Sequence, residues 1–170
     1  MGETVTKLQA AQRQLSVAIR LFFNRADPLA IHSLVSAAYQ IVWDLAKTRA
    51  ATSIVKGNAR IRPEKQQEWE RILNRAQSFL KHADRDPLDT LDFDPEITRF
   101  FLFDAIVLYC QLTSSPFHEG TVYMTWFALK YQDLLLDGAV KDMFVGSVQR
   151  GLNPDDFEFI QTMLGNAVAT

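Results

Sequence analysis

Apolar residues recur every three or four positions along most of the chain, which is the spacing of helices that bury one face. The inward face of a first predicted helix runs from Leu8 to Phe22, that of a second from Ile31 to Leu45, and that of a third from Trp69 to Ala83. A capping box formed by Thr6 and Gln9 opens the first helix. The first half of the chain is therefore predicted to be helical.

Four further helices are predicted in the second half. The first of them, from Pro95 to about Leu112, is apolar on nearly every side, as expected of a helix that is packed by several neighbours. The next runs from Pro116 toward Leu136, and two shorter helices cover Ala139 to Gln149 and Pro154 to Asn166. No segment alternates apolar and polar residues with period two between hairpin turns, so a sheet is not expected.

Five of the six prolines stand where a helix is predicted to begin, because the fixed φ of proline suits the first helical position and its missing N–H is not needed there. Four of these prolines follow a side chain that can accept hydrogen bonds from the free N–H groups of the first turn. These predicted caps are Asp27, Asp94, Ser115 and Asn153. Pro63 follows Arg62 instead, but Glu64 suits the positive end of a helix dipole.

Together these elements predict an all-α fold, an up-and-down helical bundle with additional C-terminal helices. We expect one helical domain over residues 1–170, because this length and a hydrophobic content of 48% are sufficient for one sizeable core. The single cysteine, Cys110, excludes a disulfide within the chain and is expected to behave as a small buried hydrophobe.

Charge and hydropathy give no sign of export or of a membrane. The net charge of −2 provides no overall attraction to nucleic acid or to anionic lipid. The N-terminal residues lack the pattern of a secretory signal, and the most apolar stretch, residues 100–110, contains Asp104 and is too short to span a bilayer. We therefore expect a cytoplasmic protein without a membrane partner.

Two segments of opposite charge flank the third predicted helix. Residues 47–65 contain six basic residues and one acid, a local charge of +5, and residues 84–96 contain six acids and one arginine, a local charge of −5. One interpretation is that the two segments are solvated and face each other within or between chains. The other is that the basic segment binds phosphates. The candidate phosphate ligands are then Lys47, Arg49, Lys56, Arg60 and Arg62.

The sequence has no glycine-rich phosphate loop, CxxC, HExxH or GxSxG, so most enzyme classes lack their usual signature. Candidate chemistry remains near the end of the third predicted helix, where Arg75 and His82 are seven residues apart. At about 100° per residue they lie within about 20° of each other on one stripe, together with Arg71 and Ser78. A guanidinium can hold a phosphate and an imidazole can move a proton, which is the chemistry of metal-free RNA cleavage.

This pattern resembles the HEPN superfamily, in which many ribonucleases carry an arginine, four to six intervening residues and a histidine near the end of a helix. The resemblance covers the helical content and two positions, Arg75 and His82, with Ala76 where members often place a polar residue. It implies a homodimer in which both motifs line one cleft, RNA as substrate, and a catalytic role for both residues, often in prokaryotic toxin–antitoxin and defence systems. The string from Phe79 to Pro87 also resembles bacterial proteins of unassigned function.

Both residues also have structural interpretations. Arg75 can pair with a nearby acid, and His82 can cap the C-terminus of the helix, where a cation meets the negative end of the dipole. His82, Asp84 and Asp86 are also residue types that bind divalent metals, but aspartates before Pro87 are more typical of a solvated turn. We assign no metal and no cofactor.

Two further features are interpreted as structural. His32, Tyr39 and Trp43 form a stripe beside the apolar face of the second predicted helix, which is typical of a core or of a dimer contact. Asp104 lies in a helix so apolar that its carboxyl group must find a donor or shift its pKa. We expect Asp104 to make a structural hydrogen bond.

The sequence leaves two functions open. The first is a HEPN-like RNA-binding protein or metal-independent endoribonuclease, with Arg75 positioning phosphate and His82 transferring a proton. The second is a non-catalytic homodimeric helical interaction protein in which both residues are structural. A homodimer is expected because a small domain with twelve Phe and three Trp is not expected to bury them all alone.

Overall fold

The computed structural model describes residues 2–49, 51–57, 62–134 and 152–165, and every regular element in these ranges is helical. The α-helices are α1 (Lys7–Phe23), α2 (Pro28–Lys47), α3 (Gln66–Lys81), α4 (Glu96–Thr113), α5 (His118–Lys130) and α7 (Phe157–Gly165). Two 3-10 turns stand before α3 and after α5, namely η2 (Pro63–Lys65) and η3 (Gln132–Leu134). The all-α class predicted from the sequence is confirmed.

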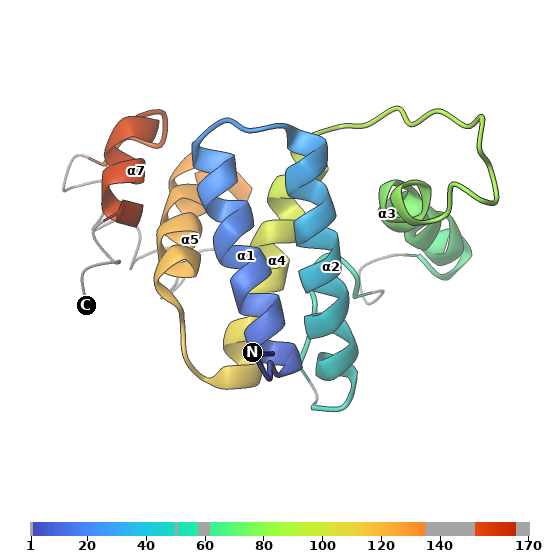
Figure 1. The fold of residues 1–170 in the computed structure, drawn as a ribbon, viewed down its shortest axis with the longest axis horizontal. Helices are drawn as coiled ribbons and strands as arrows, with labels where there is room; N and C mark the ends of the chain where they lie inside the picture. The colour runs from blue at the N-terminus through green and yellow to red at the C-terminus, as the bar shows by residue number, and fades with distance from the viewer. Residues whose placement is uncertain (1, 50, 58–61, 135–151, 166–170) are drawn as a thin grey trace.

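Helices α1, α2, α4 and α5 lie side by side as a bundle, with α7 beyond α5 and α3 beyond α2 (Figure 1). Short connections make α1–α2 and α4–α5 antiparallel pairs. Helices α2 and α4 run parallel, since His32 bonds to Thr98 near their first turns and Arg49, just after α2, bonds to Leu112 near the end of α4. The bundle thus departs from strict up-and-down order, because residues 48–95 form a crossover that carries α3.

Aromatic side chains fasten α7 to the bundle. The ring centroids of Phe22 and Trp126 are 4.8 Å apart, and those of Phe23 and Phe157 are 5.3 Å apart in an edge-to-face arrangement. These rings come from α1, α5 and the first residue of α7. Such pairs add to the stability that burial of the rings already provides.

The predicted caps are confirmed at the first two helices. The Thr6 hydroxyl accepts a hydrogen bond from the backbone N–H of Gln9, and the Gln9 side chain accepts one from the backbone N–H of Thr6. Asp27 accepts hydrogen bonds from two N–H groups of the first turn of α2, each 3.0 Å long. Asp94 accepts one from the first N–H of α4 at 2.9 Å.

Two other predicted helix starts are wrong. Helix α5 begins two residues after Pro116, and the Ser115 hydroxyl donates to the carbonyl of that proline. Helix α7 begins three residues after Pro154, and Asp156 accepts the hydrogen bond of its first turn in place of Asn153. Pro154 belongs to a turn before α7, whereas Pro116 lies in an irregular segment that leads to the extended residue Phe117; the fixed φ of proline suits both as well as a helix start.

Helix α5 is also shorter than predicted. It ends at Lys130 and is followed by the short turn η3, and residues 135 and 136 lie outside the described residues. The predicted helix over residues 139–149 lies outside the described residues.

Among the described helices, only α2 is long and apolar enough to cross a bilayer by length and composition. A buried core helix meets the same criterion. Helix α2 packs against α1 and α4 within the bundle.

Helix α3 is only thinly attached to the bundle. Leu73 and Ala76 are the buried residues among its 16. Ile72 and Leu80, which the pattern places on the inward face, are 47% and 37% exposed. The indole N–H of Trp69 donates to a backbone carbonyl of the segment 51–57 at 3.1 Å, which ties the first half of α3 to the rest of the molecule. The apolar side of α3 is therefore only partly covered.

Candidate functional site

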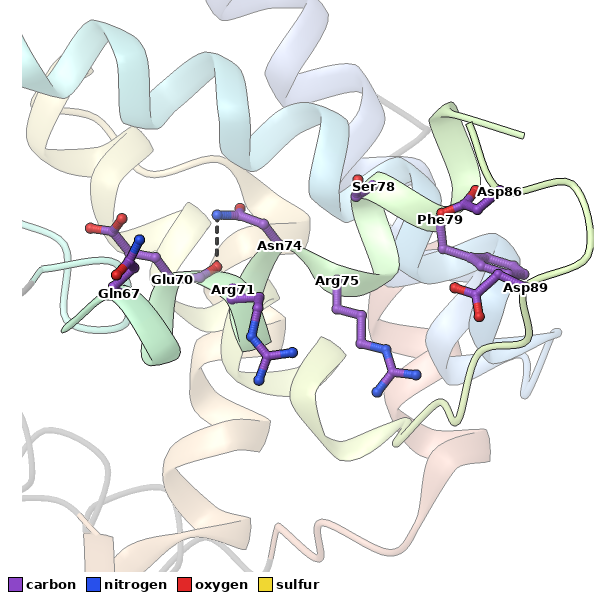
Figure 2. A pocket seen from close by; sticks show the side chains of 9 residues that line it. All are labelled: Gln67, Glu70, Arg71, Asn74, Arg75, Ser78, Phe79, Asp86 and Asp89. Atoms are coloured by element: carbon purple, nitrogen blue, oxygen red, sulfur yellow. Dashed lines mark hydrogen bonds between the residues drawn. The ribbon is translucent and has the colours of Figure 1, made fainter. Parts of the chain in front are cut away.

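Arg71 and Arg75 stand one helical turn apart on the solvent side of α3, and both are exposed. They line an open pocket of about 440 Å³, in which Figure 2 shows the two guanidinium groups projecting from the same side of the helix. The remaining wall consists of Gln67, Glu70, Asn74, Ser78, Phe79, Asp86 and Asp89. The polar stripe predicted from helical spacing is therefore one wall of a pocket.

Charged groups of both signs meet at this pocket, among them two arginines and two aspartates. Over the residues that the structure describes, Arg71 and Arg75 make no salt bridge, and Asp86 and Asp89 make none either. The two aspartates belong to the acidic segment after α3 (Figure 2). Helical spacing in the sequence predicts that Arg71 lies on the same stripe as Arg75. Asp89 lies in a loop, and the position of a loop residue cannot be predicted from helical spacing.

His82 does not line this pocket. It is the C-cap residue of α3, with φ −128° and ψ 45°, and its backbone N–H donates to the Ser78 carbonyl at 3.1 Å. The chain leaves the helix at this residue, so its side chain no longer continues the stripe of Arg75. The imidazole is half-buried and makes no hydrogen bond within the described ranges. Arg75 and His82 therefore share a helix but not one pocket.

The alternative metal site at His82, Asp84 and Asp86 receives no support. Among the described residues, no group of three or more His, Cys, Asp or Glu side chains is placed to hold a metal ion. Backbone hydrogen bonds instead form turns here, from the N–H of Arg85 to the His82 carbonyl and from the N–H of Asp89 to the Asp86 carbonyl. The segment is a set of exposed turns, as aspartates before a proline suggested.

The predicted basic segment does not form one open surface. Lys47 pairs with Asp44 at 2.9 Å, and Arg49 donates to the Leu112 carbonyl at 3.4 Å. Arg62 is exposed ahead of η2, and Arg60 lies outside the described residues. The side chains of Lys47, Arg49 and Arg62 are dispersed over the end of α2 and the residues just before α3.

Lys56, the remaining candidate of this segment, is engaged inside the protein. Its ammonium group lies 4.7 Å from the centroid of the Tyr39 ring and donates to Gln40 at 3.3 Å. Burial lowers the pKa of Lys56 to about 8. A partly buried amine with internal partners is a poor phosphate ligand, so Lys56 contributes to packing.

Asp104 holds the segment after α2 against the bundle. Its fully buried carboxyl group accepts hydrogen bonds from the hydroxyls of Tyr39 and Ser53 and from the N–H groups of Ile54 and Val55, the latter two at 2.9 and 3.1 Å. Burial and the nearby carboxylate raise the pKa of Tyr39, so its hydroxyl stays protonated and donates. The structural hydrogen bond predicted for Asp104 is confirmed.

Gly57 is required at the end of the same turn. A Cβ at this position would lie 2.3 Å from the carbonyl oxygen of Ser53. No side chain tolerates such a contact with backbone, so glycine allows the turn to close under Asp104.

The aromatic stripe of α2 belongs to the core. His32 and Tyr39 are fully buried, and Trp43 is half-buried against the core. His32 bonds through Nδ1 to the Thr98 hydroxyl at 2.9 Å, and its Nε2 has no hydrogen-bond partner among the residues that the structure describes. Burial lowers the pKa of His32 to about 4, so the ring is neutral at physiological pH.

Comparison of the chain with protein-family models, with curated proteins and with solved structures found no match. The resemblance to the HEPN superfamily therefore depends on helical content and on the spacing of Arg75 and His82. The surface at α3 offers two kinds of interaction, apolar packing beside Ile72 and ion pairing by four charged side chains that make no salt bridge with the residues that the structure describes.

Proposed function

We propose that the protein is a homodimeric interaction protein in which α3 pairs with α3 of a second copy. The observation that carries this proposal is the partly covered apolar side of α3, where Ile72 is 47% exposed and Leu80 is 37% exposed. A single helix of this length is marginal in water, and helices in proteins gain most of their stability by packing an apolar face. A second copy supplies the contacts that the bundle does not.

Arg75 lies about 60° around α3 from Ile72, and the unpaired charges at its pocket favour a second copy over an unrelated partner. In a two-fold symmetric dimer a surface patch meets itself in reverse, so Arg71 and Arg75 of one copy face Asp86 and Asp89 of the other. Within the described part of one chain these four side chains make no salt bridge. Because opposite signs lie at one pocket, the surface is complementary to itself.

Charge reversal tests this pairing. One variant carries Arg71→Glu and Arg75→Glu, and the other carries Asp86→Lys and Asp89→Lys. Each alone should dimerise at least about tenfold more weakly than the natural chain, because like charges then face each other across the symmetry axis. An equimolar mixture should form the heterodimer, since exchange of both signs restores complementarity. Sedimentation equilibrium measures the affinities.

The matched control reverses two exposed charges on α1, Lys7→Glu and Arg13→Glu, and should dimerise like the natural chain. Circular dichroism confirms that each variant is folded. A natural chain that is monomeric at tens of micromolar, about the threshold of a weak complex, contradicts the proposal. Failure of the two variants to associate when mixed contradicts it as well.

A second function, RNA binding, is favoured by the free arginine pair. Guanidinium groups bind phosphates through two parallel hydrogen bonds, and Asn74 and Ser78 add neutral donors to the same pocket. In this function Arg75 positions phosphate and His82 moves a proton in metal-independent cleavage. The acids that line the pocket repel a polyanion, which makes the homodimer the better supported function.

Neutralising the acids separates the two functions. The variant with Asp86→Asn and Asp89→Asn should bind single-stranded RNA more tightly if α3 binds phosphate, but should dimerise more weakly if the arginines pair with these acids. RNA binding should also weaken steeply with salt and with Arg75→Ala. Cleavage with chelator present should be lost in His82→Ala while thermal stability is kept. Absence of binding and cleavage excludes this second function.

A further inference from the structure

A second pocket, of about 260 Å³, lies where α1 turns into α2 and meets the first turns of α4 and α7. Its wall is mainly apolar, with Phe22, Ile31 and Phe157 as large members. Arg25 and Arg99 are the charged residues among its lining, and no acid lines it. This pocket therefore combines an apolar wall with positive charge, unlike the mixed-charge pocket on α3.

Arg25 holds a backbone conformation that L-residues rarely adopt, with φ at 54°. Its N–H donates to the Phe22 carbonyl and the N–H of Ala26 donates to the Leu21 carbonyl, each at 3.0 Å. This is the hydrogen-bond pattern of a helix end that favours glycine at the position of Arg25. An arginine at a position that favours glycine indicates that its side chain has a functional role. Its guanidinium carbon lies 5.3 Å from the centroid of the Phe157 ring, at the pocket wall.

Arg99 is held in place on α4. Its Nη1 donates to the Tyr131 hydroxyl at 3.0 Å and pairs with Glu96 at 2.8 Å. The guanidinium also lies 5.9 Å from the ring centroids of both Phe22 and Trp126. Its Nε and Nη2 have no hydrogen-bond partner in the described ranges. A guanidinium that is already positioned, with donors left over, loses little conformational entropy when an anion binds.

We propose that this pocket binds a small monocarboxylate with an apolar body. Arg25 and Arg99 bind the carboxylate, and the body packs against the rings of Phe22 and Phe157. Arg25, which makes no salt bridge in the described ranges, and the remaining donors of Arg99 favour an anion, while the apolar wall favours a non-polar remainder. The volume of about 260 Å³ limits the ligand to the size of one aromatic ring with a short chain.

Calorimetric titration with 3-phenylpropionate tests the proposal, with 3-phenylpropanamide as the neutral analogue and inorganic phosphate as the anion without an apolar body. The carboxylate should bind with a dissociation constant of about 1 mM or below, and the amide and phosphate at least about tenfold more weakly. The same titration of each variant described below tests whether Arg25 binds the carboxylate.

Arg25→Gly is the informative variant, because glycine suits the backbone at this position while the guanidinium is lost. It should weaken 3-phenylpropionate binding at least about tenfold and leave the unfolding midpoint unchanged or raised. Arg25→Lys, which keeps the charge, should retain part of the affinity. Arg13→Ala removes an exposed arginine of α1 outside the pocket and should bind like the natural chain.

Three results overturn the proposal. The first is the absence of saturable 3-phenylpropionate binding up to about 10 mM. The second is equal binding of the amide or of phosphate, which would leave either the apolar wall or the charge without a role. The third is undiminished binding by folded Arg25→Gly. If Arg25→Gly does not fold, Arg25→Asn replaces it, since asparagine also accepts this backbone conformation.

Discussion

At the scale of single residues, Asp104 illustrates a buried acid whose hydrogen bonds are all internal. Its carboxyl group accepts four hydrogen bonds, two from hydroxyls and two from backbone N–H groups. Asp104→Ala leaves these donors buried without an acceptor, so the free energy of unfolding should fall by about 3 kcal/mol or more. Tyr39→Phe removes one donor and should lower it by about 1 kcal/mol. Urea denaturation measures both, and equal losses would contradict a network centred on Asp104.

His32 should make stability depend on pH. Burial lowers its pKa from 6.5 in the unfolded chain to about 4 in the folded protein. Because the unfolded chain then binds the proton more readily, the free energy of unfolding should be highest above about pH 7 and fall as the pH decreases toward 4. The loss from this residue should be about 3 kcal/mol.

The comparison variant for this prediction is His32→Gln, which does not titrate. It should be less stable at neutral pH, because the contact with Thr98 is disturbed, but its stability should change less between pH 7 and pH 4.5. Chemical denaturation across this range measures the two slopes. Identical slopes would show that other groups cause the acid sensitivity.

At the scale of helices, the two kinds of residue before a proline should behave differently. Asp27 accepts two N–H hydrogen bonds at the start of α2, so Asp27→Ala should lower the free energy of unfolding by about 1 kcal/mol. Ser115 bonds to the Pro116 carbonyl and caps no helix. Ser115→Ala should therefore stay within about 0.5 kcal/mol of the natural chain. Denaturation midpoints of the two variants measure these changes. A large loss of stability in Ser115→Ala would contradict the prediction and indicate that Ser115 caps α5.

Helix α3 should open more readily than α4. Nine residues of α4 are buried but only two of α3, so fewer contacts must break for α3 to expose its amides. In dilute protein, hydrogen exchange should therefore be faster in α3 than in α4. The free energy of opening α3 should be well below the free energy of global unfolding. Mass spectrometry of the peptides from each helix measures this. Equal protection of both helices in the monomer would contradict the thin attachment of α3.

At the scale of the whole molecule, the proposed dimerisation through α3 should link stability to protein concentration. Association of folded chains should raise the unfolding midpoint with protein concentration and slow exchange in α3. Ile72→Glu should remove both effects, because it places a charge on the partly covered apolar side of α3. Val17→Glu is the matched control, since Val17 is 48% exposed on α1 and Ile72 is 47% exposed on α3. A midpoint independent of concentration would refute the dimer.

The sequence by itself determined those features that depend on neighbours along the chain. Helical periodicity and the hydrogen bonds that Thr6 and Asp27 accept from nearby N–H groups are local, so both were predicted and are observed. The stripe of Arg71 and Arg75 follows from the same periodicity. Helix starts near Ser115 and Asn153 were mispredicted because proline suits a turn or an irregular segment as well as a first helical turn.

Only the tertiary structure decided which distant residues meet. Asp104 was expected to find a donor, but its partner Ser53 lies in a loop that returns to α4 through the crossover between α2 and α4. Arg25 and Arg99 likewise share a pocket because the start of α4 packs beside the turn that ends α1. Such contacts depend on the parallel order of α2 and α4 and on helix packing, which the spacing of residues along one helix does not encode.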